Sequence, residues 1–242
     1  IGSIVVLDSK SGDILAMASR PNFDQDNVGD HLESNDKELY NKAIQISFPP
    51  GSVFKIVVAA ALLENNIISL EDKLFCEGFE MLGTTMIKCN TYESGGHGEL
   101  TFEQAFSKSC NSAFIQGAQE LGGERLIEMA KKFGIGEKTG IKISEEVGGI
   151  LPTEDYVKGA GIGNVAIGQG TVEVTPLQVA RFTNVIANDG IDVGVGLVKA
   201  IIDENGKILT EFNDREIKRV ISSDTSNKIK KMMSMVVEEG TG

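Results

Sequence analysis

The feature that most constrains this chain is an apolar run that contains a single charge. Every residue from Val53 to Leu63 is apolar except Lys55. A helix that is apolar on all of its faces is stable only in the interior of a domain. Residues 52–64 are therefore predicted to form a buried central helix that carries one lysine.

Lys55 is the candidate reactive group of this helix, because burial of an ammonium is energetically costly unless the group is paired or loses its proton. Ser52 stands three residues earlier, so both side chains are expected on one face of the first turn. A buried lysine with a lowered pKa can take the proton of an adjacent serine hydroxyl, and the free N–H groups at the helix start favour a developing oxyanion. The plainer alternative is a snorkelling lysine beside a capping serine. Ser34 and Lys37 have the same spacing, but their polar surroundings would not desolvate the lysine.

A second candidate group is Ser109-Cys110-Asn111, which lies at the break between two predicted helices. A serine and an amide two residues apart in a tight connection can face one cleft. Ser109 could then relay a proton, and Asn111 could bind a substrate carbonyl. Ser and Asn are also ordinary helix caps. Cys110 is interpreted as a packed thiol, because no base is near it in the sequence.

The chain has three cysteines, which are too few for a disulfide scaffold. Cys76 and Cys89 either form one bridge within a local loop or remain free as small hydrophobic residues. The two histidines, His31 and His97, offer little for a histidine-based zinc site or a Ser-His-Asp triad, and no zinc-type Cys/His spacing is present. We expect no metal and no cofactor.

The charge balance and the element pattern define the class of protein. With 23 Lys and Arg against 35 Asp and Glu, the net charge of −12 argues against nucleic acid or an anionic lipid surface as the main partner. The pattern predicts a single α/β domain over residues 1–242, with a mostly antiparallel sheet flanked by helices. Residues 134–170 are predicted to be a glycine-rich loop, and residues 21–47 an exposed excursion. The predicted hairpins are 3–8 with 14–18 and 197–203 with 207–212, and the predicted helices are 52–64, 101–108, 111–121, 124–133, 175–190 and 224–239.

The segment Pro50–Lys55 together with Ser109-Cys110-Asn111 resembles the transpeptidase domain of penicillin-binding proteins. Four further segments are similar to that family: Val5–Ser19, Asn41-Lys42-Ala43, Ile167–Gly170 and Thr175–Ala180. The run from Cys76 to Cys89 ahead of His97-Gly98 is similar to class B members that serve cell division or sporulation.

The resemblance implies a β-lactamase/transpeptidase-like fold with a helical subdomain and a serine acyl-enzyme mechanism. It implies Ser52 as nucleophile, Lys55 as base, Ser109 as proton relay, and Asn111 and Gln169 as substrate-binding residues. The implied substrates are peptidoglycan stem peptides ending in D-Ala-D-Ala, β-lactam antibiotics would acylate the same serine, and no cofactor is implied. Cell-wall assembly proteins are implied partners. The implied location is extracytoplasmic, at the outer face of the cytoplasmic membrane, held by an anchor N-terminal to this sequence.

One departure from the family concerns its third motif, Lys-Thr/Ser-Gly on an edge strand. Lys138-Thr139-Gly140 has the right letters, but it follows a helix among glycines and is expected to be non-catalytic. The true motif is expected beyond Gly242, which would leave the sheet incomplete. Two alternatives therefore stay open: a serine β-lactamase or β-lactam sensor with the same Ser-Lys pair, and a catalytically dead cell-wall scaffold domain.

Overall fold

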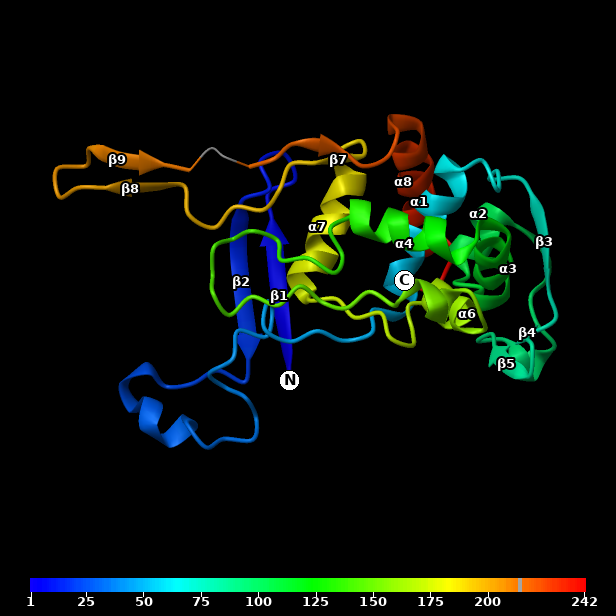
Figure 1. Ribbon diagram of the computed structural model, residues 1–242, viewed down its shortest axis with the longest axis horizontal. Coiled ribbons are helices and arrows are strands. Elements are labelled where there is room, and N and C mark those ends of the chain that lie inside the picture. The colour runs from blue at the N-terminus through cyan, green and yellow to red at the C-terminus, as the bar shows by residue number, and fades with distance from the viewer. Residues whose placement is uncertain (213–214) are drawn as a thin grey trace.

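The central helix of the computed structural model, which describes residues 1–212 and 215–242, is α1 (Lys55–Glu64). All its residues from Lys55 to Leu63 are buried, as the apolar run predicts. The chain enters α1 through a 3₁₀ turn, η2 (Gly51–Phe54), so the predicted helix starts with tighter winding than expected. Around α1 pack α3 (Asn111–Leu121), α4 (Gly123–Lys132) and α8 (Ser223–Glu238), which form the helical body in Figure 1.

Local capping signals set the starts of several helices. In α2 (Phe102–Ser107), Thr101 and Gln104 form the predicted capping box. In α7 (Pro176–Ala187), Thr175 and Gln178 form a second one, with proline in the first turn. The cap of α8 also joins two helices, because the N–H and hydroxyl of Ser222 donate to Glu64 at the end of α1, at 2.8 and 2.6 Å.

The described strands form antiparallel pairs, which confirms the mixed α/β class with antiparallel pairing. The predicted first hairpin is β1 (Gly2–Leu7) with β2 (Ile14–Arg20), and β1 packs against α7. A second hairpin, β8 (Ala200–Ile202) with β9 (Ile208–Glu211), projects from one end of the molecule in Figure 1. The remaining pairs are β3 (Lys73–Cys76) with β6 (Gly98–Thr101), β4 (Phe79–Leu82) with β5 (Thr85–Lys88), and β7 (Ile191–Asp192) with β10 (Lys218–Arg219).

The prediction of loop over residues 134–170 is wrong in part. That stretch contains two short helices, α5 (Glu154–Val157) and α6 (Gly161–Ala166), and α6 packs against α3. Its glycines serve close packing: a Cβ at Gly163 would lie 2.1 Å from a methyl of Leu82. The sequence signal failed because glycine, the residue that breaks helical patterns, is here what the packing requires.

The excursion over residues 21–47 is mostly exposed, as predicted, and contains the short 3₁₀ segment η1 (Gln25–His31). Its last part returns to the body, where Ala43 and Ile44 are buried in a small cluster with Leu177 of α7. A further 3₁₀ turn, η3 (Tyr92–Ser94), precedes β6.

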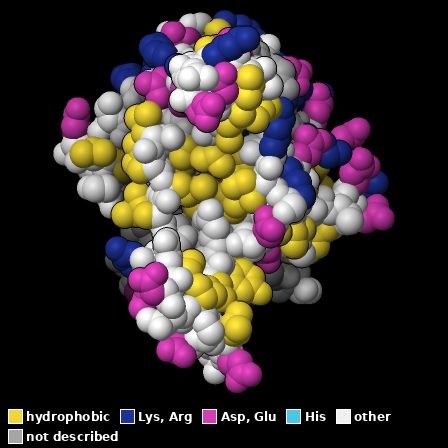
Figure 2. Space-filling model, turned by 90° about the vertical axis from the view of Figure 1, so that its left-hand side faces the viewer, with side chains coloured by type: hydrophobic (Ala, Val, Ile, Leu, Met, Phe, Trp, Pro, Cys, Tyr) yellow, Lys and Arg dark blue, Asp and Glu magenta, His cyan; other side chains and the backbone are white. Residues whose placement is uncertain are grey.

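Charged and hydrophobic side chains are interspersed on the end of the molecule that carries the β8–β9 hairpin. Figure 2 views this end and shows hydrophobic side chains gathered near the middle of the face, between acidic and basic ones. The hairpin itself exposes Ile202, Ile208 and Leu209. Among the described residues, the longest apolar helices fall short of what a bilayer crossing requires.

Candidate active site

The two residues of the predicted nucleophile–base pair occupy the turn that leads into α1. Ser52 lies in η2 and is exposed, whereas Lys55 begins α1 and is only 3% exposed. In a 3₁₀ turn, side chains three residues apart are nearly eclipsed. The turn thus places a surface hydroxyl above a buried amine, which is the arrangement that the spacing predicts.

A continuous chain of hydrogen bonds connects Lys55 to Ser52 through Ser109. Lys55 Nζ donates to Ser109 Oγ at 3.0 Å, and Ser109 Oγ donates to Ser52 Oγ at 2.9 Å. The ammonium also donates to the carbonyl oxygen of Ser109 and to Asn111 Oδ1, each at 2.8 Å. These three acceptors hold Nζ on the side of the Ser109–Asn111 turn. Within the described chain, the route from amine to nucleophile therefore runs through Ser109, where the sequence predicted direct contact.

The turn between α2 and α3 presents these acceptors. Ser109 has a left-handed backbone, with φ of 52°, and its N–H donates to Phe106 O at 3.0 Å. Asn111, the first residue of α3, donates through Nδ2 to Lys88 O at 2.9 Å, which turns its Oδ1 toward Lys55. A carboxamide nitrogen carries two hydrogens, so one N–H of Asn111 remains for another acceptor.

Burial sets the protonation of the amine. Desolvation lowers the pKa of Lys55 from 10.5 to about 8, against smaller opposing contributions from Cys110 and Cys89. The aromatic ring of Phe114, whose centroid is 5.3 Å from Nζ, forms part of the low-dielectric wall. At neutral pH about a tenth of the molecules then carry a neutral amine, the form that accepts a proton.

Gln169 lies near the turn that carries the nucleophile, in the loop after α6. Its side chain is next to Gly51, because a Cβ on Gly51 would be 3.7 Å from Gln169 Nε2. The loop approaches the backbone before Ser52 closely: Gly51 N–H donates to Gly168 O at 2.8 Å, and a Cβ on Gly168 would be 2.0 Å from Gly51 O. Gly168 also has φ of +70°. The structure thus places Gln169 next to Gly51, the residue that precedes Ser52.

The two competing matches in the sequence lie in other environments. Thr139 is buried in the loop after α4, and its N–H and hydroxyl donate to Glu146 at 2.8 and 2.5 Å. Lys138 donates to Ser144 O at 3.1 Å, so this triplet is a local turn rather than part of a strand. Lys37 lies in the exposed excursion, 5.7 Å from the ring centroid of Tyr40.

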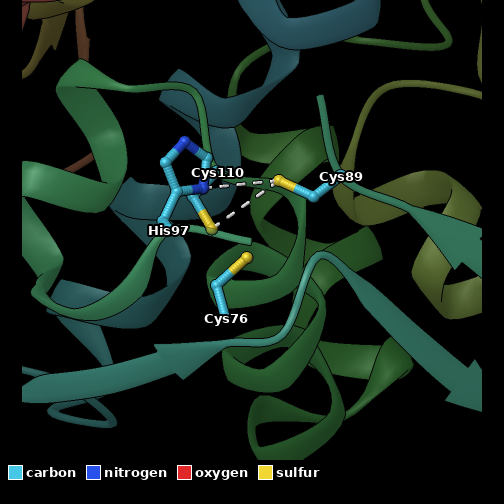
Figure 3. A group of neighbouring side chains, drawn as sticks. All are labelled: Cys76, Cys89, His97 and Cys110. Carbon is cyan, nitrogen blue, oxygen red and sulfur yellow. Dashed lines mark hydrogen bonds between the residues drawn. The ribbon is translucent and has the colours of Figure 1, made fainter. Parts of the chain in front are cut away.

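The three cysteines are free and buried, so Cys76 and Cys89 are not bridged. They lie together and beside His97, as Figure 3 shows, with 3.9 Å between the sulfurs of Cys89 and Cys110. That contact lowers the pKa of the Cys89 thiol and raises the pKa of the Cys110 thiol. The four side chains form a group whose ligand atoms all lie within 4.8 Å of one another. Sequence spacing missed the group because its members come from four separate segments.

Nearly the whole chain matches one known protein family. Residues 2–242 match the family described as the penicillin binding protein transpeptidase domain. The chain is 34% identical over 250 residues to penicillin-binding protein PbpB of Mycolicibacterium smegmatis, covering 99% of this chain and 37% of that protein. It is 34% identical to stage V sporulation protein D of Bacillus subtilis, covering 98% of this chain and 36% of that protein. The peptidoglycan D,D-transpeptidase MrdA of Haemophilus influenzae is 33% identical, covering 88% and 35%.

Solved structures show the same fold. Penicillin binding protein 3 of Mycobacterium tuberculosis, complexed with aztreonam, superposes with a TM-score of 0.86 at 35% identity, covering 97% of this chain and 51% of that one. A D,D-transpeptidase domain from Eggerthella lenta gives a TM-score of 0.90 at 25% identity, covering 100% and 62%. The chain spans little more than a third of the length of the curated relatives that it matches.

Proposed function

The chain belongs to the family of penicillin-binding protein transpeptidase domains, and from this premise we propose that it is the acyl-transfer domain of a peptidoglycan D,D-transpeptidase. Its substrates are stem peptides that end in D-Ala-D-Ala. We propose that residues 1–242 belong to one such domain. The observation that carries the proposal is the hydrogen-bond chain from Lys55 Nζ through Ser109 Oγ to Ser52 Oγ.

In acylation, the neutral amine of Lys55 draws a proton from Ser109 while Ser109 takes the proton of Ser52. The freed Ser52 Oγ forms a bond to the penultimate D-alanine carbonyl carbon. The tetrahedral oxyanion faces the backbone N–H groups of η2 that follow Gly51, because the N–H of Gly51 itself donates to Gly168 O. The amide C–N bond then breaks, and the proton held on Lys55 returns through Ser109 to the amino group of the departing D-alanine.

In the second half-reaction, an amine of a neighbouring stem attacks the Ser52 ester. The new amide forms, the ester C–O bond breaks, and the amine proton returns to Ser52 Oγ along the same chain of groups. Asn111 holds Lys55 through Oδ1, and its unused N–H is placed to receive a substrate carbonyl. Gln169 is exposed beside Gly51, which supports its assignment as a second substrate-binding residue.

One edge of β1 is unpaired in the described chain, and a groove lies beside this strand. Within the described chain β1 pairs only with β2, and Ile4 and Val6 are exposed. A groove of about 850 Å³ runs along β1 and reaches Pro50 and Val53, beside Ser52. The unpaired edge of β1 offers backbone groups to which a further strand of the family's sheet would add.

The location and partners follow from the substrate. Peptidoglycan stem peptides are crosslinked outside the cytoplasmic membrane, so the domain would work at its outer face, carried by an anchor elsewhere in the polypeptide and alongside cell-wall assembly proteins. The aztreonam complex of the Mycobacterium tuberculosis relative supports β-lactams as ligands of this site.

A fluorescent penicillin tests the proposal. The full-length natural protein that contains this sequence should form a long-lived penicillin adduct, and the modified peptide should contain Ser52. The S52A substitution should abolish the adduct. The matched control is S34A, which removes the serine of the other Ser-x-x-Lys match and should leave labelling unchanged. Rapid turnover of the drug would replace the proposal with a β-lactamase. Absence of labelling by any β-lactam would replace it with a scaffold domain.

A further inference from the structure

Three thiols and one imidazole converge on a single point beneath the active site. They are Cys76 at the end of β3, Cys89 just after β5, His97 just before β6 and Cys110 at the N-terminus of α3. One ligand atom from each lies within 4.8 Å of all the others, and the three cysteines are buried. Figure 3 shows the four side chains pointing toward one another from these separate segments.

Two of the separations between the ligand atoms match the edges of a tetrahedral zinc site. With Zn–S bonds of about 2.3 Å and a Zn–N bond of about 2.0 Å, a tetrahedron has S···S edges near 3.8 Å and S···N edges near 3.5 Å. Cys89 Sγ is 3.9 Å from Cys110 Sγ and 3.6 Å from His97 Nδ1. These separations are far longer than a disulfide bond and leave room for an ion between the atoms.

The surroundings of the thiols suit metal-bound thiolates. Asn111 N–H, at the start of α3, donates to Cys89 Sγ at 3.3 Å, and Ser112 Oγ lies 3.4 Å from Cys76 Sγ. Such contacts orient and tune metal ligands. Three buried cysteines could simply serve as small hydrophobic core residues. That interpretation does not account for the imidazole of His97, which points toward them.

The backbone is shaped to bring His97 to the cysteines. Gly96 has φ of +89°, and a Cβ there would lie 2.1 Å from Cys76 O and 2.5 Å from Gly78 N. Glycine at this position lets the loop before His97 lie against the end of β3. The convergence therefore depends on a close backbone approach that another residue would prevent.

We propose that Cys76, Cys89, His97 and Cys110 bind one Zn²⁺ ion in a closed tetrahedral site. Three sulfur ligands and one imidazole select a soft or borderline cation such as Zn²⁺ over Mg²⁺ or Ca²⁺. Binding releases the thiol protons to solvent, and no electron is transferred. With four protein ligands the ion has no open position, so it is structural and does not activate water.

This site fixes the turn that carries the catalytic groups, a consequence that rests on the proposed function. Cys110 lies between Ser109 and Asn111, and both of these accept hydrogen bonds from Lys55. An ion bound to Cys110 would tie the turn to β3 and to the segment after β5. Ser109 and Asn111 would then be held in place against the amine.

Metal binding is tested with Co²⁺ and Zn²⁺ on the reduced, metal-free protein. Co²⁺ should bind at one equivalent with the intense visible absorption and sulfur charge-transfer bands of a tetrahedral thiolate site, and Zn²⁺ should displace it. C76S and H97A should lose or shift these bands, whereas H31A, which removes the other histidine, should keep them. Weak octahedral Co²⁺ spectra, or equal loss in H31A, would overturn the site.

A measurement on the unaltered chain covers the case in which a cysteine variant does not fold. Zn²⁺ should slow alkylation of all three thiols, and a chelator should restore it. Alkylation at equal rates with and without Zn²⁺ overturns the proposal, as does a Cys–Cys disulfide as the stable form in the presence of Zn²⁺.

The coupling to catalysis is tested separately from binding. Removing the ion should slow penicillin acylation of Ser52 by roughly tenfold or more, the usual size of such supporting interactions. Unchanged acylation without the ion would overturn the positioning role. Tetrahedral Co²⁺ binding in a protein that no β-lactam labels would instead refute the proposed function and leave the metal site intact.

Discussion

The pH dependence of Ser52 acylation follows directly from the burial of Lys55. If the neutral amine is the base, the second-order rate of penicillin acylation should increase with pH and level off above the pKa of about 8. The neutral fraction is about 9% at pH 7 and about 90% at pH 9, so the rate should rise roughly tenfold over this interval. An unperturbed lysine would instead give roughly a hundredfold rise with no plateau by pH 9.

The assay is the rate of fluorescent-penicillin incorporation at fixed drug concentration between pH 6 and pH 10, with an independent check that the penicillin survives at each pH. A rate that is flat with pH, or one that climbs without a plateau, would refute the assignment of Lys55 as the base. The matched control is K37A, which removes the lysine of the exposed Ser34–Lys37 match and should give the same profile as the unaltered chain.

The same pKa makes a prediction for folding stability. Lys55 has a lower pKa in the folded chain than in the unfolded chain, so the unfolded chain binds more protons between about pH 8 and pH 10.5. Stability therefore increases with pH through this window, and below it the buried ammonium costs about 3 kcal/mol. In K55M, which lacks the titrating group, this gain should be absent. Parallel urea-unfolding curves for both proteins across the window would contradict the account.

The remaining predictions concern the groups around the pair and the core beneath it. S109A should slow acylation by about 10²- to 10⁴-fold with unchanged circular dichroism, because it interrupts the proton route; a rate within a factor of three of the unaltered chain would contradict this. G168A should lose both stability and acylation, because its Cβ would collide with Gly51 O. In the control G159A a Cβ meets nothing within 4 Å, so this variant should differ little from the unaltered chain. Thermal unfolding and penicillin labelling of both variants check this. L62A should destabilise the protein by about 2–5 kcal/mol in urea unfolding, because Leu62 is fully buried in α1, and a loss below about 1 kcal/mol would show that the core collapses around the gap.

The features that the sequence predicted well are those with local signals. The burial of α1 follows from its uninterrupted apolar run, and the starts of α2 and α7 follow from the capping boxes at Thr101 and Thr175. The hairpin of β1 and β2 follows from two apolar runs around a glycine turn. In each case a few adjacent residues determine the local conformation, so no distant contact is needed to predict it.

The features that were missed depend on contacts between distant segments. The helix α6 contains Gly161 and Gly163, where a Cβ would collide with Tyr156 and Leu82 respectively, and no local pattern reveals these contacts. Ser109 stands between Lys55 and Ser52 because the turn after α2 offers three acceptors to one amine, a geometry that spacing within η2 and α1 does not contain. The group of Cys76, Cys89, His97 and Cys110 likewise forms only when β3, β5, β6 and α3 pack together.

Intact-mass measurement of K55A at neutral pH after exposure to penicillin shows whether the buried amine is needed to activate Ser52. We expect K55A to be folded, with circular dichroism like that of the unaltered chain, and to gain no penicillin mass under conditions in which the unaltered chain is fully modified at Ser52. An adduct on Ser52 of K55A, formed at a rate close to that of the unaltered chain, would contradict the claim that this buried amine activates the serine.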